Sequence, residues 1–182
     1  MANKVDDIVK KVLVSERQIK RITKKLGKKI SKDYEGKDLI VVGLLKGCAP
    51  FMMELIKNIT IPLQIDFVQV SSYDGGTQST NNIKFKKDLE ANIEGKHVLL
   101  VDDILDTAQT ITRLLSILAD RGAVSIELCC LLDKPEGRVV QYNAKYTGKV
   151  IPKEFVIGYG LDYDEFYRNL PYVAIVKDEV YK

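Results

Sequence analysis

The sequence has little of the residue types that build metal sites and disulfide frameworks. Its 182 residues include one histidine, His97, and three cysteines. Cys129 and Cys130 are adjacent and Cys48 stands alone, so the chain has no C-x-x-C pair. These spacings argue against a zinc site and against a set of disulfide bonds. We expect His97 to be an ordinary residue at the edge of a strand.

Several targeting and nucleotide-binding patterns are also absent. No apolar run approaches the roughly 18 residues that a transmembrane helix needs. The N-terminal segment MANKVDDIVKKV is charged throughout and lacks the apolar centre of a secretory signal, so we expect a cytoplasmic protein. The patterns G-x-x-x-x-G-K-[ST] and G-x-G-x-x-G do not occur. Their absence argues against a P-loop nucleoside triphosphatase and an ordinary dinucleotide-binding domain.

The composition is typical of a single globular domain. Hydrophobic residues make up 46% and charged residues 29% of the chain, which is long enough to bury a sizeable core. Residues 1–37 hold 12 of the 28 Lys and Arg but only 5 of the 25 Asp and Glu. Such a basic segment is either a solvated helix face or a surface for an anionic partner. We expect the solvated face, with no membrane and no nucleic-acid partner.

Helix and strand patterns alternate along the chain. Ser15 and Gln18 form a capping box ahead of an amphipathic helix over residues 16–32. Pro50 begins a second helix and Gly122 ends a third. Strands are predicted at residues 39–45, 63–71, 97–103, 125–133, 154–160 and 172–176, with a short helix or turn at 162–169. This alternation predicts an α/β fold with a central, mostly parallel sheet flanked by helices.

Polar residues follow the predicted parallel strands where each strand ends. The clusters are Lys46-Gly47, residues 102–110 and residues 133–138. Because the carboxyl ends of parallel strands meet at one edge of a sheet and bind ligands there, we expect one shared site. The segment SSYDGGTQSTNN, at residues 71–82, has no apolar anchor. A long loop of this kind in a compact domain is usually functional.

The segment VLLVDDILDTAQT, at residues 98–110, carries the most chemical information. Asp102 and Asp103 end a buried strand, and small hydroxylated residues then open a helix. Backbone N–H groups of residues 106–110 would converge on one spot, an arrangement that binds phosphate. Carboxylates repel phosphate but accept hydrogen bonds from sugar hydroxyls and bind Mg²⁺. The segment therefore predicts a sugar-phosphate site; the alternative is a plain strand end with a capped helix.

The same segment resembles the 5-phosphoribosyl-1-pyrophosphate (PRPP) motif of type I phosphoribosyltransferases. Four further segments resemble the 6-oxopurine, or hypoxanthine-guanine, branch of that family in matching order: LLKG (44–47), SSYDGGTQST (71–80), LLDKPEGR (131–138) and EFVIGYGLDYDEFYRNLP (154–171). The resemblance implies a type I phosphoribosyltransferase fold in one domain over residues 1–182. A small hood subdomain would be built from the N- and C-terminal segments.

The resemblance also implies a reaction of purine salvage. The 5-phosphoribosyl group would pass from PRPP to N9 of hypoxanthine or guanine, which gives IMP or GMP and releases pyrophosphate. Mg²⁺ would be required, and the chain would form a homo-dimer or homo-tetramer. The preference among hypoxanthine, guanine and xanthine is left open.

Roles on PRPP follow from the matched motifs. Asp102 and Asp103 would hold the ribose hydroxyls directly or through Mg²⁺, and Asp162 would bind a second Mg²⁺. The 5′-phosphate would be bound by residues of the turn, namely Asp106, Thr107, Ala108, Gln109 and Thr110. Pyrophosphate would be bound by Leu45, Lys46, Gly47 and Arg168, and the Leu45-Lys46 peptide bond can be cis in the family.

The purine roles fall on other matched positions. Asp106 would act as the general base that takes the N7 proton. Lys134 would donate to O6 and so select 6-oxopurines over adenine. Phe155 would stack on the base, while the backbone of Val156 and the segment around Asp162 would contact the purine edge. Finally, Ser72 and Tyr73 of the catalytic loop would close over the site and exclude water.

The sequence departs from the family motif at Ala108, where glycine is usual. If residue 108 needs a positive φ, alanine there costs about 1 kcal/mol or more. If its φ is negative, alanine is harmless and stiffens the start of the helix. The effect of this change on PRPP affinity is left open.

Two other classes of protein fit parts of the sequence. A regulator that senses PRPP or nucleotides on the same fold would use the basic residues 1–37 and tolerate Ala108. Such a sensor does not need Asp106, Lys134 and Asp162 together. A receiver-type phosphoacceptor domain would place its acidic pair early in a shorter chain, whereas Asp102-Asp103 lies mid-chain. The enzyme is the reading that accounts for all of the motifs.

Overall fold

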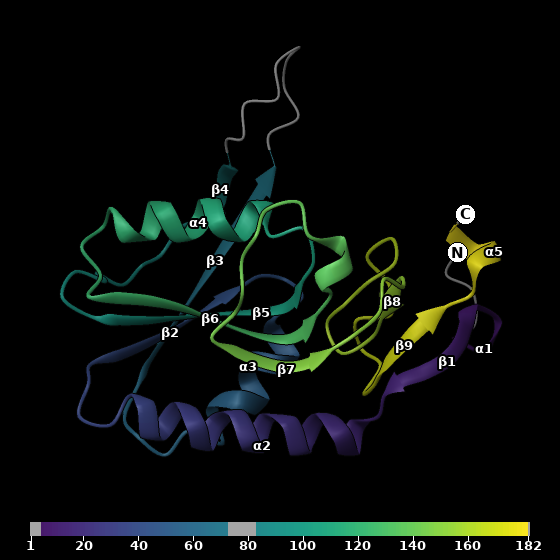
Figure 1. Cartoon of the computed structure of the whole chain (residues 1–182), viewed down its shortest axis with the longest axis horizontal. Coiled ribbons are helices and arrows are strands. Elements are labelled where there is room, and N and C mark those ends of the chain that lie inside the picture. The colour runs from purple at the N-terminus through teal and green to yellow at the C-terminus, as the bar shows by residue number, and fades with distance from the viewer. Residues whose placement is uncertain (1–4, 73–82, 182) are drawn as a thin grey trace, which may run out of the picture.

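A six-stranded sheet forms the centre of the computed structural model, which describes residues 5–72 and 83–181. Its strand order is β4-β3-β2-β5-β6-β7 (Figure 1). The strands are β2 (Leu39–Leu44), β3 (Gln64–Ser72), β4 (Ile83–Lys87), β5 (His97–Leu105), β6 (Ser125–Asp133) and β7 (Tyr146–Val150). All neighbours are parallel except β3 and β4, which are antiparallel. The predicted mostly parallel α/β sheet is confirmed.

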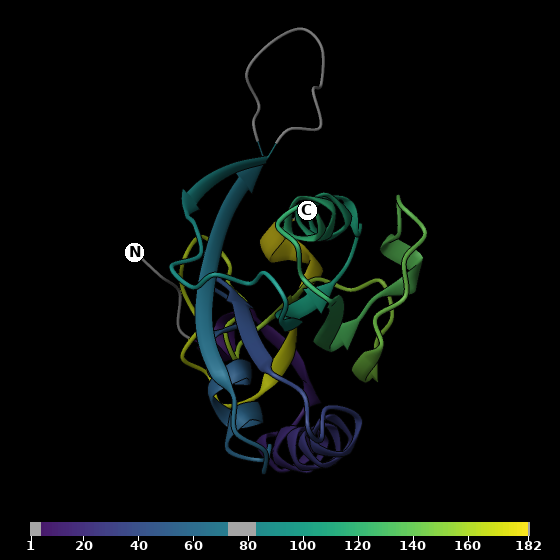
Figure 2. The ribbon, with the colours of Figure 1, turned by 90° about the vertical axis from the view of Figure 1, so that its left-hand side faces the viewer.

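Helices cover both faces of this sheet (Figures 1 and 2). Helix α4 (Gln109–Ala119) lies on one face, and α2 (Glu16–Asp33) and α3 (Ala49–Ile56) lie on the other. Each face has its own buried apolar cluster, because the central strands are hydrophobic on both sides. The predicted capping box at Ser15 and Gln18 is present at the start of α2. No helix in the described ranges is long and apolar enough to span a bilayer.

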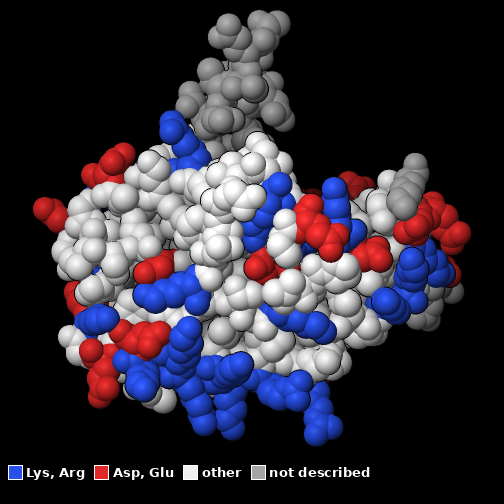
Figure 3. All heavy atoms as spheres, viewed as in Figure 1, with Lys and Arg blue, Asp and Glu red and all other residues white. Residues whose placement is uncertain are grey.

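Helix α2 turns a basic face to solvent. It buries a narrow stripe that includes Ile19, Leu26 and Ile30. Lys and Arg line its outer side, along the lower edge of the molecule in Figure 3. These exposed residues are Arg17, Lys20, Arg21, Lys24, Lys25, Lys28, Lys29 and Lys32. The basic N-terminal segment is therefore a solvent-exposed helix face in this chain.

A second, three-stranded antiparallel sheet joins the two ends of the chain. Its order is β1-β9-β8, with β1 (Val9–Val14), β9 (Val173–Val176) and β8 (Val156–Ile157). Two single-turn helices flank it, α1 (Val5–Ile8) and α5 (Asp178–Tyr181). The small sheet lies beyond the carboxyl ends of β5 and β6 (Figure 1). It has its own apolar cluster around Ile8, Ile157 and Val176.

Several predicted boundaries differ from the structure. Strand β5 continues to Leu105, past the predicted end at residue 103, because it stays paired with β6 as far as Asp133. The predicted strand at 154–160 is confined to Val156–Ile157, since residues 158–160 all have positive φ, which breaks an extended strand. Residues 162–169 form turns and no helix. Strands β1, β4 and β7 were not predicted.

Asp66 of β3 binds the segment that follows β4 through hydrogen bonds. Its side chain is only 8% exposed and accepts hydrogen bonds from three backbone N–H groups, those of Phe67 (2.6 Å), Glu90 (2.8 Å) and Ala91 (2.9 Å). The ammonium group of Lys87 lies 3.5 Å away. Burial by itself raises the pKa of Asp66, but the backbone donors outweigh this effect and lower the pKa below its usual value.

We expect Asp66→Asn to lower the free energy of unfolding at pH 7 by about 2 kcal/mol, because charged acceptors make the stronger hydrogen bonds. The stabilisation is present above the unfolded pKa of about 3.9 and is lost as pH falls through the lowered folded pKa. The difference from wild type should therefore shrink below about pH 4. Urea unfolding across this range measures it. Exposed Asp120→Asn is the control, and a difference that stays constant with pH contradicts the role of the charge.

Candidate active site

Two adjacent carboxylates occupy the end of the central strand β5. Asp102 pairs in register with Cys130 of β6 and is 8% exposed. Its Oδ1 accepts the N–H of Asp103 at 3.0 Å, and Oδ1 of Asp103 accepts the N–H of Ile104 at 2.8 Å. The two acids therefore lie at the sheet edge where β2, β5 and β6 all end.

These two carboxyl groups have perturbed acidity. Burial, followed by the neighbouring charge of Asp103, raises the pKa of Asp102 well above its usual value. Burial also raises the pKa of Asp103, although the Ile104 N–H and the charge of Arg168 act in the opposite direction. A pair of carboxylates in this environment favours a bound cation or hydroxyl donors.

The loop after β2 presses against this acidic pair. The Leu45-Lys46 peptide bond is cis, as the family resemblance implied. A Cβ atom on Gly47 would lie 1.7 Å from Asp103 Oδ2. A side chain at position 47 would therefore have to displace the Asp103 carboxylate. Gly160 of the C-terminal segment is equally close, since its Cβ would lie 1.9 Å from the carbonyl oxygen of Gly47.

Arg168 and Lys46 connect this loop to the C-terminal segment. Arg168 Nη1 lies 2.9 Å from Asp162 Oδ1 and donates to the Gly160 carbonyl oxygen at 2.7 Å. Glu165 Oε2 accepts from Lys46 Nζ at 2.8 Å and from Arg168 Nη2 at 3.2 Å. Arg168 Nε is buried and has no hydrogen-bond partner within the described residues. An unpaired guanidinium donor suits an incoming anion.

The turn from β5 into α4 forms a cradle of backbone donors. The N–H groups of residues 107–110 donate no hydrogen bond within the described part of the chain, as expected for a helix N-terminus. Ala108 has φ +65°, so residue 108 adopts the left-handed conformation that normally selects glycine. Alanine in this conformation costs about 1–2 kcal/mol. Ala108 is also buried, so its methyl group packs against the core and offsets part of that cost.

Lys134 and Asp106 meet beside this turn. The Lys134 ammonium group forms an ion pair with Asp106 Oδ2. The Lys134 side chain is 13% exposed, whereas that of Asp106 is 39% exposed. Gly137 makes room for the pair, because a Cβ on residue 137 would lie 1.8 Å from Asp106 Oδ1. The structure thus brings the two residues with the most specific predicted purine roles into direct contact.

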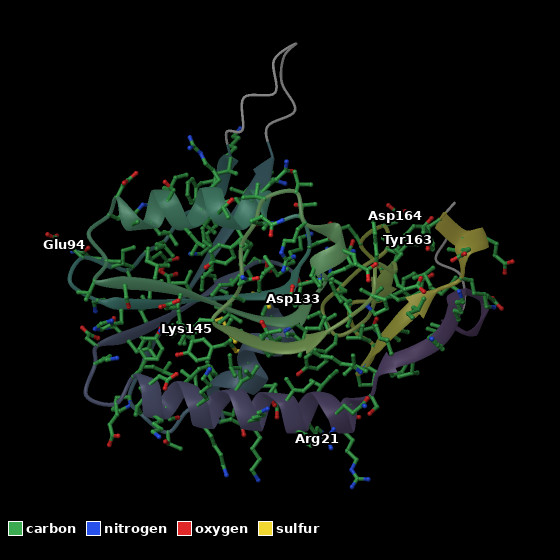
Figure 4. All side chains as sticks on the ribbon, viewed as in Figure 1. Arg21, Glu94, Asp133, Lys145, Tyr163 and Asp164 are labelled. Atoms are coloured by element: carbon green, nitrogen blue, oxygen red, sulfur yellow. The ribbon has the colours of Figure 1, made fainter. Side chains whose placement is uncertain are left out.

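Arg138 is a site residue whose role the sequence did not reveal. Its side chain is 6% exposed and pairs with Asp133. Its guanidinium group also donates to the carbonyl oxygens of Leu105 and Asp106, which fixes the backbone that carries the acid. Asp133 lies centrally, at the end of β6 (Figure 4). An arginine in a polar loop resembles a surface residue in sequence, and only burial distinguishes it.

Phe155 and Val156 lie at the start of β8. Val156 is buried, and Phe155 is half-buried beside Tyr163 and Tyr181. A cavity of about 490 Å³ has Phe155 and Lys134 in its walls. Ser72 is the last residue of β3. Tyr73 and the rest of the expected catalytic loop lie outside the described residues.

Asp102 and Asp103 are suitable ligands for Mg²⁺, whereas Asp162 already has other partners. Asp102 and Asp103 offer the hard oxygen donors that Mg²⁺ prefers. The described residues hold no group of three or more His, Cys, Asp or Glu side chains that could enclose a metal ion. Mg²⁺ is usually bound by one or two carboxylates together with waters and substrate phosphates, which is the number of carboxylates that Asp102 and Asp103 supply. Asp162 already uses both carboxylate oxygens, one toward Arg168 and one toward the Glu165 N–H.

Comparisons with known proteins point to one family. The family described as "Phosphoribosyl transferase domain" matches residues 11–164. A hypoxanthine-guanine phosphoribosyltransferase of Streptococcus pneumoniae is 52% identical over 177 residues, which cover 97% of this chain and 98% of that protein. A crystal structure of a hypoxanthine phosphoribosyltransferase from Staphylococcus aureus is 50% identical with a TM-score of 0.94, covering 100% and 99% of the two chains. A Bacillus anthracis hypoxanthine-guanine phosphoribosyltransferase structure is 40% identical with a TM-score of 0.86, covering 93% and 98%.

The fold and the family match define the chain as a phosphoribosyl transferase domain protein. Its identity to curated relatives over nearly the full length is far above what the fold alone requires. The chain belongs to the hypoxanthine-guanine phosphoribosyltransferase family.

We expect Asp102→Asn to raise the free energy of unfolding by about 1–2 kcal/mol at pH 8 in EDTA, because it removes a buried charge. The folded chain holds the Asp102 proton more tightly than the unfolded chain does. Wild-type stability should therefore fall as pH rises from about 3.9 toward the raised folded pKa, while the variant, which keeps only Asp103, should lose less over the same range. Chemical denaturation measures both chains. A variant less stable than wild type at pH 8 contradicts this reasoning.

A second prediction concerns Gly137. We expect Gly137→Ala to reduce kcat about 100-fold, because the new methyl group displaces the Asp106 carboxylate from Lys134. The displaced atom is the end of a flexible side chain, so the melting temperature should change little. Steady-state kinetics and thermal melting separate the two effects. The exposed neighbour Glu136→Ala is the control, and unchanged kcat in Gly137→Ala excludes the steric role.

Proposed function

We propose that this chain transfers the 5-phosphoribosyl group of PRPP to N9 of hypoxanthine or guanine and releases pyrophosphate. The ion pair between Lys134 and Asp106 is the observation that carries the proposal. It sets a hydrogen-bond donor directly beside an acceptor. A 6-oxopurine presents the complementary edge, because its O6 accepts and its neighbouring N7–H donates. Adenine has a 6-amino donor, which would face the Lys134 ammonium group.

PRPP would lie along the edge of the sheet where the strands end. The N–H groups at the start of α4, with the hydroxyls of Thr107 and Thr110, would bind its 5′-phosphate. Asp102 and Asp103 would accept hydrogen bonds from its ribose hydroxyls. The Leu45-Lys46-Gly47 loop and Arg168 would bind pyrophosphate, with the unpaired Nε of Arg168 as one donor.

The chemical step joins these two subsites. The purine N9 attacks C1′ of the ribose as the bond from C1′ to pyrophosphate breaks, and Asp106 takes the proton from N7. Lys134 stabilises the negative charge that would otherwise build up on O6. Arg168 and the Lys46 loop hold the departing pyrophosphate. Asp102 and Asp103 would hold Mg²⁺, which would neutralise phosphate charge. Asp162 would hold a second Mg²⁺ after it releases Arg168 or the Glu165 N–H, which its two carboxylate oxygens contact here.

The other assigned roles complete the proposal. Phe155 stacks on the base, the backbone of Val156 reads its edge, and Ser72 and Tyr73 exclude water from the reacting ribose. We further propose that residues 1–182 act as one domain, with the small sheet as a hood. The enzyme would work in the cytoplasm as a homo-dimer or homo-tetramer, without a nucleic-acid partner.

The test is an absorbance assay with PRPP and Mg²⁺ in which hypoxanthine, guanine, xanthine and adenine are offered separately. We expect turnover of 6-oxopurines and none of adenine. Asp106→Asn should lower kcat by about 10²–10⁴-fold, because amide oxygen is a poor proton acceptor.

Binding measurements separate this proposal from a sensory role. Asp106→Asn should still bind PRPP with Mg²⁺, because its backbone donors remain. Asp120→Asn, an exposed change at the far end of α4, should match wild type. A chain that binds PRPP or nucleotide but converts no base would overturn the enzyme and favour a regulator on the same fold.

A further inference from the structure

Phe155 is held by aromatic residues from two later segments of the chain. Tyr181 stacks on its ring, with centroids 5.0 Å apart and an angle of 27° between the planes. Tyr163 meets it edge-on at 5.8 Å and 84°. The carbonyl oxygen of Phe155 accepts the Val176 N–H at 3.0 Å. The C-terminal segment therefore restrains both the backbone and the ring of this residue.

The short helix α5 that carries Tyr181 is itself anchored. Tyr163 Oη donates to the carbonyl oxygen of Val180 at 2.9 Å, so the same tyrosine contacts Phe155 and fixes α5. Figure 4 shows Tyr163 beside this helix. The backbone N–H of Lys177 donates to the carbonyl oxygen of Ile8 at 2.9 Å. The ammonium group of Lys177 donates to the carbonyl oxygen of Asp7 at 2.9 Å. Tyr181 thus belongs to an ordered turn although it lies near the end of the chain.

Tyr181 also faces the purine subsite. The 490 Å³ cavity that has Phe155 and Lys134 in its walls is also lined by Tyr181 and Asp178. The rings of Tyr181 and Phe155 are in direct stacking contact, which leaves no gap for a base between them. Tyr181 therefore acts on the Phe155 ring and does not form the second half of a sandwich around the purine.

We propose that Tyr181 is a positioning residue for the purine, which fixes the Phe155 ring in the orientation that receives the base. A half-buried phenylalanine in the wall of a cavity loses rotamer freedom when a base stacks on it, and this loss of entropy weakens binding. A ring already restrained by Tyr181 and Tyr163 has less freedom to lose. This inference rests on the proposed stacking role of Phe155.

The first test compares Tyr181→Ala with Tyr181→Phe. Stacking between two aromatic rings stabilises their arrangement. We expect its loss in Tyr181→Ala to raise KM for hypoxanthine about three- to tenfold. The KM for PRPP and the melting temperature should stay at wild-type values. Tyr181→Phe keeps the ring that stacks on Phe155 and removes the hydroxyl that donates to Asp178 Oδ1 (3.3 Å), so its KM for hypoxanthine should match wild type. If alanine lowers the melting temperature, Tyr181→Leu replaces it as the variant that retains apolar bulk.

A double-mutant cycle with Phe155→Ala decides how Tyr181 acts. If Tyr181 works through Phe155, adding Tyr181→Ala to Phe155→Ala should not raise KM for the base further. Additive effects would overturn the proposal, as would a fall in KM, which would mean that Tyr181 competes with the base. An unchanged KM in Phe155→Ala alone would instead remove the stacking role on which both ideas depend, while turnover of 6-oxopurines would still support the enzyme.

Discussion

The register of β5 between β2 and β6 is the constraint on which the site depends. Gly43 of β2 lies opposite Val101, and Asp102 lies opposite Cys130 of β6. Because both pairings are parallel, the loop after β2, the acids of β5 and the Lys134 turn after β6 all reach one edge of the sheet. A slip of one residue would turn the Asp102 side chain to the opposite face. The buried apolar residues on both faces of β5 prevent that slip.

Most charged side chains at this edge of the sheet form ion pairs with each other. Lys134 is matched by Asp106, and Arg168 by Asp162 and Glu165. Asp102 and Asp103 are the exception, since burial and mutual repulsion raise the pKa of Asp102 and make the ligand-free edge less stable than an uncharged one. Such a cost is typical of functional sites, where the charge is stabilised only when the ligand binds.

The sequence predicted the elements whose pattern is strong. The capped amphipathic helix α2 and the continuous apolar strand β6 matched their expected ranges closely. Strands β1, β4 and β7 were missed, because they are short and partly exposed and because polar residues or glycine interrupt their apolar pattern. Each becomes a strand by pairing with a partner, respectively β9, β3 and β6. That choice lies in tertiary contacts and not in local propensity.

By itself, the sequence determined the α/β class and the family motifs with their order. The class follows from apolar periodicity and the motifs from local residue patterns, whereas the roles on PRPP and the purine are predictions that the resemblance to the family implies. Tertiary structure decided the positive φ of Ala108, the pairing of Lys134 with Asp106, the burial of Arg138 and the stacking of Tyr181 on Phe155. Each of these arises where segments distant along the chain pack together, and no local pattern records which segments will meet.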